Sequence, residues 1–162
     1  LYSFVDISNV EFLEVLFLRT YTEQEIMNMR PEQLTSILYR AFMEKLRQSI
    51  KFLDDRNYIA VNYLLQDCND ILYRLGAGIN YKAGVIADHL EALYNFCAER
   101  LLEANTKKDK AMMEDVLHII GNIEEGWNKA MKDNDANFLL DNKLDSYENH
   151  LYHQPANLDI LE

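Results

Sequence analysis

The run from Glu91 to Asn105, EALYNFCAERLLEAN, is the stretch that most constrains the fold. At about 100° per residue, its apolar side chains fall on one narrow stripe, and its glutamates point elsewhere. The stripe, extended by one turn upstream, consists of Ile86, Leu90, Leu93, Tyr94, Cys97, Leu101 and Ala104. The sequence therefore predicts a helix with one buried face over about 82–105.

Three further stretches have helical periodicity. The stretch from Pro31 to about Leu53 carries apolar residues over more than half of its circumference, so we expect it to bury two faces. A second helix is expected at about 57–75, ended by Gly76 and Gly78. A fourth is expected at about 109–131, where three residues widen the apolar stripe towards a second face: Met112, Ile119 and Ile123. Short connections between the four favour an antiparallel, up-down-up-down four-helix bundle in an all-α fold.

The amino-terminal region predicts two short helices. Ser8 with Glu11 has the spacing of a capping box, and the apolar run that follows indicates a helix at about 9–19. Thr22 with Glu25 repeats the spacing and predicts a second short helix, which Pro31 ends. We therefore expect residues 1–30 to be a capping segment, followed by the bundle domain at 31–131.

Composition excludes several classes of function. The formal net charge of −11 opposes binding to nucleic acid and to anionic membrane surfaces. The longest apolar run, Val15–Leu18, is too short to span a bilayer, so no membrane insertion is expected. Acidic residues stand where a signal peptide needs positive charge, which indicates a cytoplasmic protein.

The carboxy-terminal region, residues 132–162, is an acidic extension. Residues 133–162 carry seven acidic residues and one lysine. Helical spacing of apolar residues persists there, so the region is expected to be either a short helix before Pro155 or a solvated tail. We find no repeat or glycine-rich linker that would indicate a second globular domain.

The sequence offers no catalytic or metal-binding motif. A di-metal site in a bundle needs two Glu-x-x-His pairs, whereas this chain has a single Asp115-x-x-His118 pair that points away from the apolar stripe. Cys68 and Cys97 each lie on an apolar stripe and are expected to be buried free thiols. We therefore expect no enzyme activity, no metal and no cofactor.

Glu124 projects within the apolar stripe of the helix expected at about 109–131. Its carboxylate is expected either to be paired or solvated at the edge of the stripe, or to contact a partner.

A set of residues in a fixed order resembles a known family. In the helix expected at about 82–105, these residues are Leu93, Tyr94, Phe96, Arg100, Leu101, Ala104 and Asn105. Other matching residues are Tyr21, Pro31-Glu32-Gln33-Leu34, Leu38-Tyr39, Ile71, Leu72, Leu75, Glu114 and Trp127. Together these residues resemble the flagellar export chaperone FliS family over about Tyr21 to Met131.

The resemblance implies a cytosolic four-helix-bundle chaperone without catalysis or cofactor. Such a chaperone binds the carboxy-terminal region of flagellin, prevents its premature polymerisation and aids its delivery to the flagellar type III export gate. With the wide apolar arcs of the first and fourth long helices, the resemblance gives a set of expected partner-binding residues. These are Leu18, Tyr21, Ile26, Leu38, Tyr39, Phe42, Leu93, Tyr94, Ile119, Ile123 and Trp127.

Two alternatives stay open at this stage. The protein is either this chaperone or an unrelated helical-bundle adaptor, such as a dimerising interaction protein, that shares only the architecture. The apolar leader, residues 1–20, is expected to be either a movable cover over part of the client groove or a permanent fifth core helix. Neither the oligomeric state nor the affinity for a client follows from the sequence.

Overall fold

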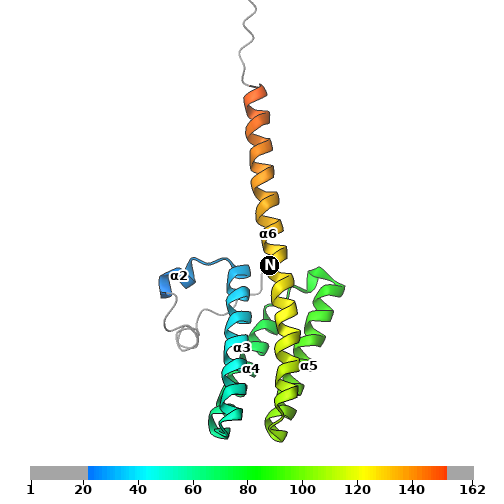
Figure 1. Ribbon diagram of the computed structural model, residues 1–162. Coiled ribbons are helices and arrows are strands. Elements are labelled where there is room, and N and C mark those ends of the chain that lie inside the picture. The colour runs from blue at the N-terminus through cyan, green and yellow to red at the C-terminus, as the bar shows by residue number, and fades with distance from the viewer. Residues whose placement is uncertain (1–21, 153–162) are drawn as a thin grey trace, which may run out of the picture. The chain divides into compact units, whose positions relative to one another are not determined.

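The computed structural model describes residues 22–152, and the side chains of residues 22–135 apart from Glu23. Every regular element in that range is a helix (Figure 1). The elements are α2 (Glu23–Met27), α3 (Pro31–Asp54), α4 (Tyr58–Ala77), the 3-10 helix η2 (Tyr81–Ala83), α5 (Val85–Lys107) and α6 (Lys110–Tyr152). The prediction of an all-α fold with four long helices and a short helix before them is confirmed. The helix expected at 9–19 lies outside the described residues.

The start of α2 and the start of α3 follow the predicted local chemistry. Thr22 Oγ1 accepts a hydrogen bond from the Glu25 backbone N–H at 3.3 Å, and the Glu25 carboxylate accepts one from the Thr22 N–H at 2.7 Å. This is the reciprocal capping box that the Thr22 and Glu25 spacing predicts. Pro31 is the first residue of α3, where its missing N–H costs no hydrogen bond.

Helix α4 begins after a side-chain cap by Asn57 and ends at Gly78. Asn57 Oδ1 accepts a hydrogen bond from the Ala60 N–H at 3.2 Å and so caps the first turn. At the other end Gly78 is the C-cap, as expected, whereas Gly76 lies inside the last turn of the helix. The prediction that Gly76 also stops the helix is therefore wrong.

The buried stripe of α5 is shifted by one residue at its beginning. Ile86, expected in the stripe, is 67% exposed, and Ala87 is buried in its place. Ala87, Tyr94 and Leu101 are spaced seven residues apart, which keeps them on the side that faces neighbouring helices in a bundle. Ile86 lies about 100° away from Ala87 around the axis and so turns towards solvent.

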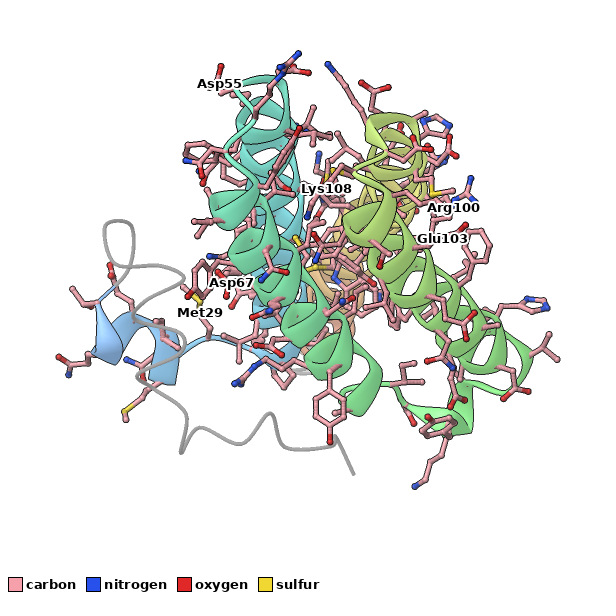
Figure 2. The ribbon with its side chains drawn as sticks, turned by 90° about the horizontal axis from the view of Figure 1, so that it is seen from below. Met29, Asp55, Asp67, Arg100, Glu103 and Lys108 are labelled. Carbon is pink, nitrogen blue, oxygen red and sulfur yellow. The ribbon has the colours of Figure 1, made fainter. Side chains whose placement is uncertain are left out.

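Contacts between side chains join the four long helices in a closed order. The pairs are Lys45–Asp67 between α3 and α4 at 2.7 Å, Asn62–Asn105 between α4 and α5 at 2.7 Å, Arg100–Asp115 between α5 and α6 at 3.0 Å, and Lys110–Asp54 between α6 and α3 at 2.9 Å. Lys110 begins α6 and Asp54 ends α3, so these two helices are antiparallel. For residues up to Gly126 the structure is therefore the predicted up-down-up-down bundle (Figure 2).

The core is apolar and includes both cysteines. Its largest fully buried side chains come from all four long helices: Tyr39, Phe42, Leu46, Val61, Leu65, Ile71, Leu101, Met113, Val116 and Ile120. Cys68 and Cys97 are buried free thiols, as predicted. Burial raises the pKa of both thiols, that of Cys97 to about 11. Both are therefore protonated at neutral pH and serve as small core residues.

Helix α6 is longer than its periodicity predicts. We expected it to end near Met131, but it continues to Tyr152 without a break. No proline or glycine stands between Trp127 and Tyr152, so the backbone meets no residue that would end a helix. The carboxy-terminal helix is thus a continuation of α6 and not a separate element.

The chain divides into two compact units, Leu1–Gly126 and Trp127–Glu162. The second unit is described here only as the helical segment from Trp127 to Tyr152. Among the helices described, none has a stretch that is long and apolar enough to cross a membrane.

Replacing Gly121 by alanine should stabilise the bundle. Gly121 lies within α6, and a Cβ there would meet only Met43 Cε at 3.5 Å, an ordinary van der Waals distance. Alanine should therefore raise the free energy of unfolding by about 0.5–1 kcal/mol, measured as a shift of the urea midpoint. The matched control is Gly84→Ala, which should destabilise because Gly84 has φ of +66°. A lowered midpoint for Gly121→Ala would show that Met43 cannot tolerate the added methyl group.

Candidate functional site

Five of the expected partner-binding residues lie in the protein interior: Ile26, Leu38, Tyr39, Phe42 and Tyr94. Tyr39 and Phe42 are completely buried, so a partner cannot touch them unless the bundle opens. Their apolar character is explained by core packing, because α3 contacts both α4 and α6 and needs an apolar arc wide enough for two neighbours.

Tyr39 and Tyr94 form a polar contact across this core. Their hydroxyl groups share a hydrogen bond, and their ring centroids are 6.5 Å apart with the ring planes tilted by 48°. The contact links α3 to α5, which are diagonal to each other in the order of helices. It gives the two hydroxyls a hydrogen bond to each other inside the core.

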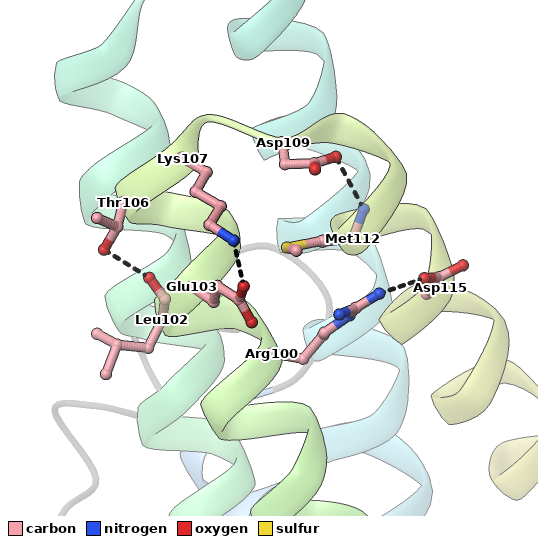
Figure 3. Close-up of polar contacts among 8 residues, drawn as sticks. All are labelled: Arg100, Leu102, Glu103, Thr106, Lys107, Asp109, Met112 and Asp115. Atoms are coloured by element: carbon pink, nitrogen blue, oxygen red, sulfur yellow. Dashed lines mark hydrogen bonds and ion pairs between the residues drawn. The ribbon is translucent and has the colours of Figure 1, made fainter.

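The three expected partner-binding residues of the bundle that are not in its interior lie on α5 and α6: Leu93, Ile119 and Ile123. The ion pair between Arg100 Nη2 and Asp115 Oδ2 shows which levels of these antiparallel helices lie side by side (Figure 3). Leu93 lies two turns before Arg100, and Ile119 and Ile123 lie about one and two turns after Asp115. The three apolar residues therefore stand at neighbouring levels along one seam.

These three residues are partly accessible to solvent. Leu93 is 37% exposed, and Ile119 and Ile123 are half-buried. Further along the outer side of α5, Phe96 is also exposed. We call Leu93, Ile119 and Ile123 the α5/α6 seam. It is an apolar strip that is not fully covered by the bundle itself.

The three remaining expected partner-binding residues lie outside the described part of the bundle. Trp127 is half-buried and belongs to the second compact unit. Leu18 and Tyr21 lie outside the described residues. Glu124 is half-buried, and neither of its carboxylate oxygens is among the side-chain atoms that are buried without a partner. Its position in the apolar stripe therefore imposes no unpaired buried charge.

A groove that was not predicted from the sequence lies between α4 and α5. It has a volume of about 510 Å³ and is lined by Asn69, Leu72, Tyr73, Gly76, Ala77, Tyr81, Glu91, Tyr94, Asn95 and Ala98. We call these ten residues the α4/α5 groove. Gly76, Ala77 and Ala98 are the signal in the sequence, because small side chains on facing helices leave space between them.

Electrostatic contacts at one end of this groove involve Tyr81. Removal from water and the nearby carboxylates of Glu91 and Asp88 raise the pKa of Tyr81 above its ordinary value. Asn69 also lines the groove, and its Oδ1 is buried without a hydrogen-bond partner. This oxygen is sealed from solvent and is therefore not accessible to a ligand in the groove.

The residues considered for metal binding are used differently. Asp115 is paired with Arg100, and His118 is exposed with Nε2 3.3 Å from Asn122 Nδ2. His89 is exposed as well. Within the described part of the chain, no three His, Cys, Asp or Glu residues are grouped so that they could hold a metal ion.

Comparison with known proteins places the chain in a family. The family described as "Flagellar protein FliS" matches residues 17–134. The flagellar secretion chaperone FliS of Salmonella typhimurium strain LT2 is 32% identical over 107 residues, which cover 65% of this chain and 79% of the relative. The chaperone of the same name from Vibrio cholerae serotype O1 is 28% identical over 100 residues, covering 61% of this chain and 74% of the relative. That of Bacillus subtilis strain 168 is 22% identical over 112 residues, covering 69% and 84%.

The helical bundle and these relatives define a class of protein, the flagellar secretion chaperones, which bind other proteins and are not enzymes. This chain belongs to the FliS family. The resemblance inferred from its motifs is thereby confirmed.

The hydroxyl contact in the core should be measurable as an energetic coupling. Tyr94→Phe removes the buried hydrogen bond between the two hydroxyls and should cost about 1–3 kcal/mol of unfolding free energy. The double variant Tyr39→Phe/Tyr94→Phe should cost less than the sum of the single variants, because each single variant already removes the same hydrogen bond. Urea unfolding of the four proteins gives the coupling. Strict additivity would show that the two hydroxyls do not depend on each other.

Stability should fall at alkaline pH through these same groups. Burial raises the pKa of both Tyr39 and Tyr94, so the folded state favours their neutral forms. Their contribution is complete below about pH 10, the ordinary pKa of tyrosine, and is lost as the pH rises above it. The contribution of Cys97 to stability is likewise complete below about pH 8.5 and is lost as the pH rises from there through its raised pKa of about 11.

The pH dependence can be measured by urea unfolding at pH 7 to 11. The variant Tyr39→Phe/Tyr94→Phe should lose less stability above pH 10 than the unmodified protein loses. Equal losses in the two proteins would assign the alkaline sensitivity to other groups.

Proposed function

We propose that this protein is a cytosolic export chaperone that binds the carboxy-terminal region of flagellin. In this role it prevents premature polymerisation of flagellin and aids delivery of the client to the flagellar type III export apparatus. Membership of the FliS family, whose relatives are named flagellar secretion chaperones, supports a flagellar client. The observation that carries the binding mechanism is the partly exposed α5/α6 seam.

The seam suits an amphipathic helix of the client. Leu93, Ile119 and Ile123 offer apolar surface along two helical turns, which matches anchor residues spaced three, four and seven apart on a partner helix. The Arg100–Asp115 ion pair borders this surface and marks where its polar edge begins. Docking of a client helix would remove the remaining apolar area from water.

The buried family residues have a different role in this proposal. Leu38, Tyr39, Phe42 and Tyr94 hold the bundle together and so fix the spacing of the helices that carry the seam. Direct contact of these residues with the client would require displacement of core packing. Leu18, Tyr21 and Trp127 stay as proposed contacts of the client, whereas Ile26 is buried like these four residues and would have to be uncovered first.

Isothermal titration with flagellin should show one-to-one binding with a large negative heat-capacity change, because apolar surface is buried. Flagellin that lacks its last helix should not bind. The double variant Leu93→Ser/Ile119→Ser should weaken binding at least tenfold, about 1.4 kcal/mol, by removing two apolar contacts.

Leu102→Ser is the matched control. Leu102 is 64% exposed on the same helix but points about 180° away from Leu93, so its replacement should leave flagellin binding unchanged. Equal loss for both variants would argue against docking at the seam. No binding of flagellin at all would refute the proposed client and favour a helical adaptor with another partner.

A further inference from the structure

Past Trp127 the apolar pattern of α6 changes. Met113 and Ile120 are completely buried in the bundle core, and Trp127 stands seven residues further on. Continued at the same spacing, this stripe reaches only polar residues: Asn134, Asp141 and Glu148. The helix nevertheless runs without a break to Tyr152, within the second compact unit. The stripe that packs in the bundle core therefore does not explain the apolar residues in this last part of α6.

A second apolar stripe begins where the first one ends. Four apolar residues follow one another at intervals of four, three and four positions: Leu140, Leu144, Tyr147 and Leu151. This is the spacing of the d and a positions of a coiled coil, in which two helices bury one seam against each other. The a position before this stripe is Asn137, and the d position before Asn137 is Asp133, which is exposed and ends the repeat. The repeat therefore extends over residues 137–151.

The positions that flank this stripe are acidic on one side and basic on the other. Asp141 and Glu148 occupy the e positions, whereas Lys143 and His150 occupy the g positions. In a parallel pair of helices, a g residue stands beside the e residue that begins five positions further on in the other helix, and opposite charges there select partner and orientation. Lys143 of each copy is thereby matched with Glu148 of the second copy. In an antiparallel pair, Lys143 would instead stand beside the same lysine of the second copy and be repelled.

Asn137 favours the same arrangement. A single asparagine at an a position specifies the register and the number of strands of a parallel coiled coil, at a cost in stability. The two copies of Asn137 meet only when the helices are parallel and in register, where each amide offers both a donor and an acceptor. The stripe, its flanking charges and this amide are therefore complementary to themselves, which makes a second copy of the chain the occupant that fits.

We propose that residues 137–151 of α6 form a parallel, two-stranded coiled coil with the same residues of a second copy of this chain. The net charge of −11 opposes association, so the dimer is reversible and forms as the protein concentration rises. The family match covers residues 17–134, and the coiled coil lies beyond it. The proposal does not depend on the α5/α6 seam. Where flagellin binds as proposed, one dimer would carry two clients, still at one client per copy.

Sedimentation equilibrium of the full chain tests the dimer. The chain should show a monomer–dimer equilibrium over about a hundredfold range of concentration. Leu140→Ser should raise the dissociation constant of the dimer about tenfold or more, because it removes a d residue. The matched control is Leu139→Ser, the same change at the neighbouring c position, which should leave the constant unchanged. Circular dichroism establishes that each variant is folded. A monomer at every concentration up to millimolar, or equal loss for both variants, would overturn the proposal.

Charge reversals test the pairing of g with e. Lys143→Glu and Glu148→Lys should each raise the dissociation constant about tenfold, because each places like charges side by side. Glu148→Lys is the sharper test, since it lowers the net negative charge of the chain and would strengthen association if only overall repulsion mattered. A mixture of the two variants should form a heterodimer, because opposite charges meet again at both pairs. Failure of the mixture to associate would overturn the parallel arrangement.

Other occupants of the stripe give distinct results. If the chain's own residues 1–20 covered it, the full chain would stay monomeric and their deletion would create the dimer. If copies associated through the bundle, Leu93→Ser/Ile119→Ser would abolish the dimer and Leu140→Ser would not. Either result would overturn the proposal. Asn137→Leu should tighten association and no longer restrict it to two copies, whereas weaker association would contradict the a position assigned to Asn137.

Discussion

The hydrogen bond between Tyr39 and Tyr94 is the contact on which the arrangement of the bundle most depends. Apolar side chains attract one another without fixing a register, whereas two buried hydroxyls are satisfied only when their helices stand at one level. The contact joins α3 to α5 across the core. Because Tyr94 also lines the α4/α5 groove, the same contact fixes the lower surface of that groove.

Local chemistry made much of the fold predictable. The Thr22 capping box, Pro31 at the start of α3 and Gly78 at the end of α4 each act within a few residues, so their effect can be derived from sequence. The errors arose where distant packing decides. Ile86 and Ala87 differ by one position, and only the neighbouring helices select which of them is buried. The length of α6 was underestimated because an acidic composition does not itself end a helix.

The candidate surfaces were less predictable than the fold. A wide apolar arc on α3 is produced equally by two core neighbours and by a partner, so Leu38 and Phe42 could not be assigned from periodicity. Leu93, Ile119 and Ile123 were named separately, and only the register of α5 against α6, which the Arg100–Asp115 contact marks, brings them to one seam. The α4/α5 groove depends on small residues and an unpaired amide, which have no distinctive pattern in a sequence.

The acidity of the chain bears on how these surfaces are used. Large exposed apolar residues such as Phe96 and Leu102 would favour association between copies of the protein. A net charge of −11 makes two copies repel each other, but the same field attracts a segment that carries positive charge. The net charge of the chain therefore opposes association between copies at these apolar residues and favours partner segments that carry positive charge.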